Sequence, residues 1–309
     1  MAIQWFPGHM NATKKAISER VRAGIDVVIE MLDARLPGSS CNPLLAELTQ
    51  GKPALKLLNK QDLADPERTA LWLAHFNALP DTRALAFDAS EVAPAQRLVE
   101  ASRALAPLRG GMTKPMRVLI CGIPNVGKST LVNTLAGRRI AKTGDEAGIT
   151  KLEQKIALAN DFDLFDTPGM MWPRIINPES GYLLAASGAI GRNAFDEEEV
   201  ALELIGRIRR ARPGQLDERY KLTGTEVLAD DELLAQIARK RAAALPGGRV
   251  NMQKAAEIVM HEFRQGLLGR VTLETPDEFA AWAAAGAAAE AERQARRKKP
   301  VREARDLSE

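Results

Sequence analysis

The feature that most constrains this fold is the octapeptide GIPNVGKS at residues 122–129, which matches the phosphate-binding pattern GxxxxGK[ST]. It follows RVLIC (117–121), a run typical of a buried strand, and leads into residues 129–136, whose apolar side chains recur at helical spacing. Glycines let the backbone N–H groups of such a loop converge on phosphate oxygens at a helix N-terminus. The octapeptide therefore predicts a nucleotide-binding α/β unit rather than a glycine-rich turn with a chance lysine.

The polar residues of this loop have separate predicted roles. Lys128 is expected to reach the β- and γ-phosphates and to act in catalysis, and the Ser129 hydroxyl is expected to ligate Mg²⁺. The other residues predicted to contact the nucleotide here are Asn125, Val126, Gly127 and Thr130.

A second motif, DTPG at residues 166–169, ends the apolar run 163–165. A carboxylate at the carboxyl end of a strand is where a second Mg²⁺-linked group belongs, so Asp166 is a candidate metal residue. The Gly169 N–H is expected to contact the γ-phosphate and to sense its loss. Between the two motifs, Thr150 is predicted to complete the Mg²⁺ coordination and to take part in catalysis. Taken alone, DTPG could also be a simple turn.

The third motif, NKQD at residues 59–62, follows the strand-like run ALKLL. It is similar to the NKxD motif with which GTPases select guanine. Asp62 can accept two hydrogen bonds from the guanine N1–H and amino group, a donor pair that adenine lacks. Asn59 is expected to brace the pocket, Lys60 to pack its stem over the base, and Ser90 in a later DAS sequence to lie by the guanine oxygen. A lone NKxD sequence is also compatible with a polar loop.

The spacing of apolar residues predicts two domains and a tail. In the first half, short apolar runs alternate with helix-length segments, which favours an α/β fold with a parallel-type sheet flanked by helices. From about residue 178 the strand signals vanish, and apolar residues recur three and four apart. We predict an α/β domain at 1–177, an all-α domain at 178–280 and a charged tail at 281–309. From Trp282 this tail is expected to begin as a frayed, alanine-rich helix and to run into a disordered segment. The predicted strands are 25–32, 54–58, 84–87, 117–121, 155–158 and 163–165, and the predicted C-terminal helices are 197–212, 231–244 and 251–266.

The order of the motifs is unusual, because the guanine motif at 59–62 precedes the phosphate-binding loop at 122–129. Most GTPases have the reverse order, so the sequence resembles the circularly permuted GTPases. Within them it is similar to the YlqF/RbgA family of ribosome-biogenesis GTPases, from Trp5 to about Pro276. The segments that carry the resemblance are WFPGHM, DVVIEMLDARLPGSSCNP, NKQD, GIPNVGKSTLVN, DTPGMMWP and LLGRVTLETP.

The resemblance implies a circularly permuted P-loop GTPase domain followed by a small all-α domain that binds RNA or the ribosome. It implies an enzyme that hydrolyses GTP to GDP and phosphate, slowly alone and faster on the large (50S) ribosomal subunit or its precursor, in late assembly of that subunit. One departure is Glu146-Ala147, where the family pattern has a basic residue and a proline. This departure bears on the geometry around Thr150.

Met170 stands where Ras-type enzymes have the glutamine that positions water, and a methionine cannot orient water. His9 is the candidate that the resemblance supplies, since an imidazole can orient water near neutral pH. The resemblance also implies that Asn125 helps to bind K⁺, whose charge near the β/γ bridge can replace an arginine finger. The alternatives are a structural His9 and an Asn125 that only caps the loop.

The chain after Gly169 has no further strand to enter, because the run at 25–32 already takes the place of the strand that would follow. It is therefore expected to lead into the α-helical domain, so that loss of the γ-phosphate reorients residues beyond about 178. A rigid linker is the alternative.

Charge and composition limit the remaining functions. Lys and Arg total 43 against 40 Asp and Glu, and this net charge of +3 does not by itself indicate a nucleic-acid partner. Residues 207–270 hold 13 basic and 8 acidic residues, with clusters at 207–212 and 239–241, which favours contact with rRNA phosphates. Two cysteines and three histidines argue against a disulfide framework and structural zinc. Without a long apolar run or a signal peptide, we expect a cytoplasmic monomer.

Two other functions stay open at this point. One is a nucleotide-gated rRNA-binding scaffold with incidental hydrolysis, which Met170 favours. The other is a GTPase of tRNA modification or membrane metal transport, which the lack of a cofactor motif and of a membrane segment disfavours.

Overall fold

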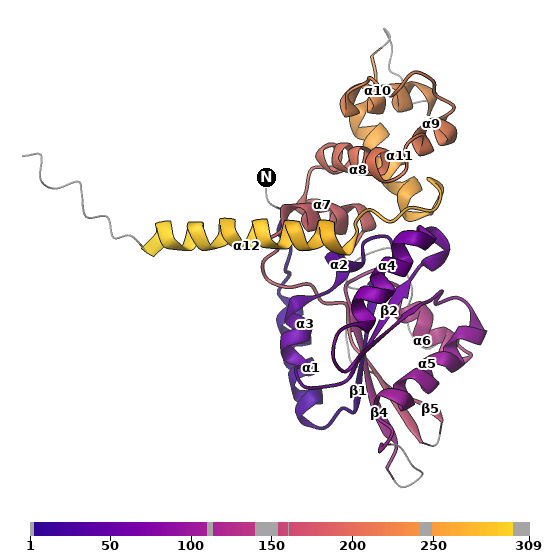
Figure 1. Cartoon of the computed structure of the whole chain (residues 1–309), viewed down its shortest axis with the longest axis vertical. Helices are drawn as coiled ribbons and strands as arrows, with labels where there is room; N and C mark the ends of the chain where they lie inside the picture. The colour runs from indigo at the N-terminus through magenta and orange to yellow at the C-terminus, as the bar shows by residue number, and fades with distance from the viewer. Residues whose placement is uncertain (1–2, 110–113, 140–153, 160, 242–248, 299–309) are drawn as a thin grey trace, which may run out of the picture.

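The computed structural model describes residues 3–109, 114–139, 154–159, 161–241 and 249–298. It contains a six-stranded sheet with a group of helices stacked above one end of its strands (Figure 1). The strands are β1 (Val27–Asp33), β2 (Ala54–Asn59), β3 (Thr82–Ala86), β4 (Met116–Gly122), β5 (Gln154–Ala159) and β6 (Phe162–Asp166). Each of the six predicted runs forms a strand.

The strands lie in the order β3-β2-β1-β4-β6-β5. The first five in this order are parallel, as predicted, but β5 pairs antiparallel with β6. The prediction of a parallel-type sheet is therefore wrong for β5. The reason is the connection: β6 begins at Phe162, directly after β5 ends at Ala159, and a parallel pair needs a crossover of about a dozen residues or more.

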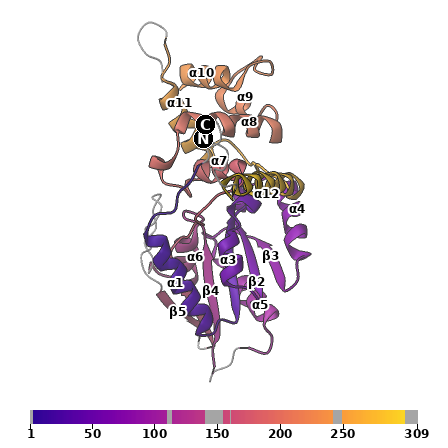
Figure 2. The same ribbon diagram turned by 90° about the vertical axis from the view of Figure 1, so that its left-hand side faces the viewer.

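Helices cover both faces of the sheet. On one face lie α1 (His9–Arg22) and α3 (Pro43–Leu48), on the other α5 (Val92–Leu105) and α6 (Lys128–Ala136), and α4 (Pro66–Asn77) packs beside β3 (Figures 1 and 2). All seven residues of β1 are buried, as expected of a central strand covered on both faces. Of these helices, the apolar spacing at 71–78 and 129–136 predicts α4 and α6, and α1, α3 and α5 are additional.

The all-α part begins at α7, which packs on the short helix α2 (Pro37–Ser40). Asn177, Asp196 and Asn251 precede α7, α8 and α11, and their side chains accept hydrogen bonds from first-turn N–H groups. The three helices predicted from apolar spacing are α8, α10 and α11, while α7 and α9 are additional. The bounds are α7 (Pro178–Ser187), α8 (Glu197–Ala211), α9 (Gln215–Tyr220), α10 (Asp230–Lys240) and α11 (Met252–Arg264), with single turns η1 (Gln61–Leu63) and η2 (Arg192–Ala194).

After α11 the chain returns to the sheet. Val271 N donates to Leu63 O at 3.0 Å, and Leu273 N donates to Arg35 O at 2.7 Å. The predicted boundary at residue 280 therefore falls after a segment that already packs on the α/β domain.

The last helix, α12 (Pro276–Lys298), projects sideways from the junction of sheet and helices (Figure 1). Near its start the Phe279 ring lies 5.9 Å from the Trp72 ring, and Arg207 stacks 4.3 Å over Trp282. The frayed helix predicted from Trp282 is part of α12, which extends to Lys298, because the alanine-rich sequence has high helix propensity and these rings anchor the start of the helix. Residues 299–309 lie outside the described residues. Within the described ranges, no helix combines the length and the apolar character needed to cross a bilayer.

Candidate functional site

The three motifs meet because parallel strands end at a common edge. Asp33 at the end of β1 stands opposite Asn59 at the end of β2, and Ile120 of β4 stands opposite Asp166 of β6. Gly122 ends β4 between them. The carboxyl edge of such a sheet is where α/β proteins bind their ligands. The loop at 122–129, the DTPG sequence and the NKQD sequence therefore share one site.

The loop after β4 has left-handed φ values and close packing, which explain its glycines. Asn125 and Gly127 have left-handed φ values of 57° and 103°. A Cβ added at Gly127 would overlap the Asn59 side-chain amide, and one added at Gly169 would lie 2.8 Å from Pro124 Cα. Only glycine lets α6 begin this close to β2 and lets the DTPG turn rest on the loop.

Lys128 and Asp166 form a buried charged centre at this loop. Lys128 Nζ donates to the carbonyl oxygens of Gly122 and Ile123 at 3.1 and 2.7 Å. Burial lowers the pKa of Lys128 to about 8, although the nearby Asp166 acts to raise it. Burial raises the pKa of Asp166 to about 6, against the effect of Lys128. The Lys128 ammonium and the Asp166 carboxylate are thus poorly solvated by water. Poor solvation favours the binding of an anion at Lys128 and of a cation at Asp166.

The Asp166 carboxylate fits a divalent cation. Both of its oxygens are buried, and neither has a hydrogen-bond partner of good geometry among the described residues. A buried, unpaired carboxylate is costly unless it is neutralised or binds a cation, and carboxylate and hydroxyl oxygens suit Mg²⁺. Ser129 and Thr130 are half-buried in the first turn of α6, next to Lys128. Thr150 lies outside the described residues.

Removing the Asp166 charge is expected to stabilise the nucleotide-free protein. The folded-state pKa of about 6 exceeds the ordinary 3.8, so the folded state binds more protons between these values, and stability falls as the pH rises through them. At pH 7 the ionised Asp166 therefore lowers the free energy of unfolding by about 3 kcal/mol, and Asp166→Asn removes this destabilisation. Urea unfolding in EDTA should show the variant more stable than wild type at pH 7, with a gain that shrinks towards zero at pH 4. A variant less stable at pH 7 would contradict a buried, unpaired carboxylate.

Asn59 joins the guanine motif to the phosphate-binding loop. Its Nδ2 donates to Val126 O at 2.7 Å, and its Oδ1 accepts from Ala89 N at 2.8 Å. Ser90, next in the chain, is exposed, and its N–H and hydroxyl both donate to Asp88 Oδ1, at 2.8 and 2.6 Å. The DAS sequence is therefore held beside the loop by Asn59, which agrees with the predicted bracing role.

Lys60 and Asp62 occupy the rim of this site. Lys60 has a left-handed backbone (φ 63°), and its Nζ donates to Asn125 O at 3.1 Å. Asp62 lies in η1 and is exposed. An exposed carboxylate beside the loop is available to the edge of a base, so the arrangement suits the recognition predicted for NKQD.

The two residues after DTPG are fully buried and tied to other segments. Met170 N donates to Gly122 O at 3.1 Å, and Met170 O accepts from Asn42 Nδ2 at 2.7 Å. Met171 N contacts Met10 Sδ at 3.4 Å. Met170 therefore cannot face an attacking water, in agreement with its chemistry. The sequence analysis does not single out Asn42, although it lies in the LPGSSCNP segment, or Met10.

His9 is exposed and begins α1, directly before the buried Met10. The contact between Met10 and Met171 thus fixes the first turn of α1 near the DTPG turn. No described hydrogen bond uses the His9 side chain.

Asn125 contacts the all-α part as well as the sheet. Its Nδ2 donates at 2.8 Å to the carbonyl oxygen of Gly188, the C-cap of α7. Arg264 of α11 donates to two other carbonyls at this helix end, those of Ala186 and Ala185, at 2.8 and 3.0 Å. The phosphate-binding loop therefore touches the C-terminal end of α7 directly.

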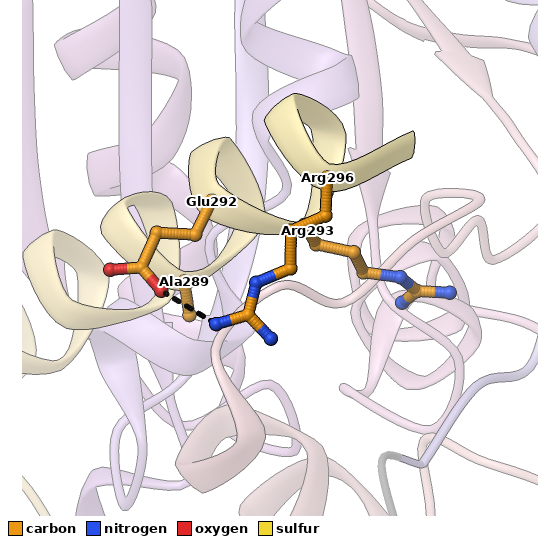
Figure 3. Close-up of a pocket in the computed structure, with 4 residues that line it drawn as sticks. All are labelled: Ala289, Glu292, Arg293 and Arg296. Carbon is orange, nitrogen blue, oxygen red and sulfur yellow. Dashed lines mark ion pairs between the residues drawn. The ribbon is translucent and has the colours of Figure 1, made fainter. Parts of the chain in front are cut away.

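A separate surface cavity lies on α12, away from this edge. Ala289, Glu292, Arg293 and Arg296 line it (Figure 3), and Glu292 and Arg296 are 4.0 Å apart. All four residues come from one exposed helix, so the cavity has no part in the site described above.

The comparisons with known proteins agree with this geometry. A family model described as "50S ribosome-binding GTPase" matches residues 117–218, which begin in β4 just before the phosphate-binding loop and exclude the guanine motif upstream. The ribosome biogenesis GTPase A of Bacillus cereus is 39% identical, with 90% of this chain and 96% of the relative covered. That of Priestia megaterium is 40% identical, with 90% and 98% covered. This chain belongs to the ribosome biogenesis GTPase A (YlqF/RbgA) family.

Solved structures of the family support the same conclusion. GNP-bound YlqF from T. maritima has a TM-score of 0.62 and 25% identity, covering 86% of this chain and 98% of that one. A GDP-bound structure of TM YlqF has a TM-score of 0.65 and 26% identity, covering 85% and 99%. The predictions of a permuted GTPase fold, a GTP-hydrolysing enzyme and a guanine nucleotide as ligand are confirmed by this membership.

Proposed function

We propose that this protein hydrolyses GTP at the carboxyl edge of its sheet and acts in late assembly of the large (50S) ribosomal subunit. The observation that carries the proposal is the convergence of the phosphate-binding loop, Asp166 and the guanine motif at one edge. The relatives named ribosome biogenesis GTPase A support the ribosomal part, and so does the 50S ribosome-binding description of the family model. We place this activity in the cytoplasm, in a monomer.

Ser129, Thr150 and Asp166 are the residues proposed to hold Mg²⁺, and Asn125 is proposed to hold K⁺. These cations supply positive charge around the β- and γ-phosphates, where charge develops during phosphoryl transfer. The unpaired carboxylate of Asp166 supports the first assignment. The K⁺ assignment is compatible with the contact between Asn125 and Gly188. That contact uses the amide nitrogen of Asn125, whereas a cation would be held by its amide oxygen.

We propose that His9 orients the attacking water, Lys128 holds the β- and γ-phosphates, and Gly169 contacts the γ-phosphate through its N–H. The buried side chain of Met170 supports a water-positioning group outside the DTPG segment. The exposure of His9 and the tether from Met10 to Met171 support the choice of this histidine. An exposed imidazole at the end of a helix is free to be placed by a partner, which agrees with an enzyme that is slow alone.

The surface proposed to contact rRNA consists of the exposed members of the two basic clusters at 207–212 and 239–241. In the cluster at 207–212, Arg207 is buried against Trp282, Arg209 pairs with Asp230 at 2.6 Å and Arg212 pairs with Asp65 at 3.0 Å. Arg207 and Arg209 are therefore engaged within the protein, whereas Arg210 and Arg212 stay exposed and can still contact phosphates. The end of α10 offers two more exposed basic side chains, Arg239 and Lys240.

The proposal is tested by measuring GTP hydrolysis in KCl with and without purified large subunits. We expect strong stimulation by the subunits, loss of that stimulation in His9→Ala, and a lower rate when NaCl replaces KCl. Arg239→Ala combined with Lys240→Ala should weaken subunit binding at unchanged basal activity. Stimulation that persists in His9→Ala would contradict the role of His9.

The second candidate is a nucleotide-gated rRNA-binding scaffold in which hydrolysis is incidental. Met170 in the water-positioning place favours it. It is distinguished by the same assay: the scaffold requires GTP-dependent subunit binding without stimulated hydrolysis.

A further inference from the structure

We infer that Asp33 and Arg35 are positioning residues for the guanine site, which set Lys60 in place and tie it to the end of α11. The inference rests on the proposed function, because it requires that Lys60 pack over a guanine base. It concerns a buried ion-pair chain that the site described above does not use.

Asp33 connects to Lys60 directly. Asp33 ends β1 opposite Asn59, and its Oδ2 accepts from Lys60 Nζ at 3.0 Å. The same Nζ donates to Asn125 O in the phosphate-binding loop, at 3.1 Å. Lys60 also has a left-handed backbone (φ 63°), which is sterically disfavoured for a non-glycine residue. The Asp33 carboxylate therefore fixes the direction of a side chain whose backbone is already strained.

Arg35 fixes the Asp33 carboxylate in turn. Its Nε and Nη2 donate to Asp33 Oδ1 and Oδ2 at 2.9 and 2.8 Å, and both residues are 1% exposed. The two parallel bonds form a bidentate pair, which holds the carboxylate in one plane. The pKa of Asp33 lies well below its ordinary range, since Arg35 and Lys60 outweigh the effect of burial. The pair leaves Asp33 charged, as a partner for Lys60 must be.

The other end of the Arg35 guanidinium reaches α11. Its Nη1 donates at 2.7 Å to the carbonyl oxygen of Phe263, and its centre lies 4.3 Å from the Phe263 ring. Phe263 is the penultimate residue of α11. Its carbonyl oxygen also accepts from Gly266 N at 3.1 Å in the turn that ends the helix, and a cation at this end complements the helix dipole. One guanidinium thus joins the guanine site to the all-α part, and a shift of α11 must disturb Lys60.

A double-mutant cycle tests the link between Asp33 and Lys60. We expect Asp33→Asn and Lys60→Ala each to weaken GDP binding about 10-fold, and the double variant to be weakened about 10-fold as well, because both remove the same contact. A double variant weakened about 100-fold would overturn the inference, as would unchanged GDP affinity in a folded Asp33→Asn protein. If Lys60→Ala alone leaves GDP affinity unchanged, the proposed guanine site itself fails.

Arg35→Lys tests the link between the guanine site and α11. It also provides a test of the inference if the Asp33→Asn protein does not fold. Lysine keeps a positive charge beside Asp33 but cannot bind Asp33 in two places and Phe263 at the same time. In wild type, GDP should slow hydrogen exchange at the end of α11, and in Arg35→Lys this slowing should be lost while GDP affinity falls about 3-fold. Arg219→Ala is the matched control, because Arg219 pairs with the adjacent Glu262 at 2.8 Å and does not touch the guanine site. Equal effects of GDP on α11 in wild type and Arg35→Lys would overturn the link.

Discussion

Lys128→Met is expected to abolish GTP hydrolysis, with a loss of about 10²–10³-fold, while the protein keeps its fold. The loss is expected because the Lys128 ammonium is the group proposed to neutralise the β- and γ-phosphates. The fold should survive because Lys128 is buried, and its buried positive charge destabilises the folded state. Its pKa falls from 10.5 to about 8, so below pH 8 the folded state holds a proton that burial disfavours. Methionine fills a similar volume without this cost.

The measurement is single-turnover GTP hydrolysis together with thermal unfolding of the nucleotide-free protein. The matched control is Lys15→Met, because the Lys15 side chain is 78% exposed on α1 and its partner is Glu19. We expect wild-type activity in the control, and in Lys128→Met a midpoint of unfolding equal to or above that of wild type. Hydrolysis at the wild-type rate in Lys128→Met would show that the phosphates bind elsewhere.

Asp62→Asn is expected to weaken GTP binding by about 10²–10⁴-fold. The variant loses two hydrogen bonds to an ionised acceptor, each of which contributes about 1.5–3 kcal/mol. An asparagine offers one acceptor oxygen and one donor amide, and xanthine presents a carbonyl oxygen where guanine has its amino group. The variant should therefore gain affinity for xanthosine triphosphate as it loses affinity for GTP, and its weak ATP binding should not change.

Competition binding of GTP, ATP and xanthosine triphosphate measures this exchange of preference. Asp62 is exposed, so the substitution should leave stability unchanged, and Asp81→Asn at another exposed position controls for the lost charge. An equal loss for all three nucleotides would point to damaged structure, and unchanged GTP affinity would remove Asp62 from the guanine site.

Local patterns predict much of this fold because their causes are local. The six strands follow from short apolar runs, and the phosphate-binding loop follows from glycines at fixed spacing between a strand and a helix. The direction of β5 could also be read from chain length alone, since the two residues between Ala159 and Phe162 cannot make a crossover. The alanine content from Trp282 onward predicts a helix there, but the packing of Arg207 on Trp282 that anchors α12 depends on the tertiary structure.

The guanine and phosphate motifs are recognisable in the sequence because their chemistry requires particular residue types at fixed spacings. Their order along the chain is enough to indicate permutation. The sequence does not indicate which partner an individual side chain contacts when the two residues lie far apart in the chain. RIRRAR at 207–212 has the composition of an RNA-binding patch, yet Arg207 and Arg212 hold Trp282 and Asp65 in the folded protein.

The sequence by itself determined the sheet, the three nucleotide motifs and the permuted order. Only the tertiary structure decided that Met170 is held by Asn42, that Asn125 reaches Gly188, and that Arg35 joins Asp33 to Phe263. The physical reason is that a motif is specified by neighbours a few residues apart, whereas these partners are 63 to 228 residues apart for all but one contact. Such contacts exist only once the chain has folded and burial has made each polar group require a partner.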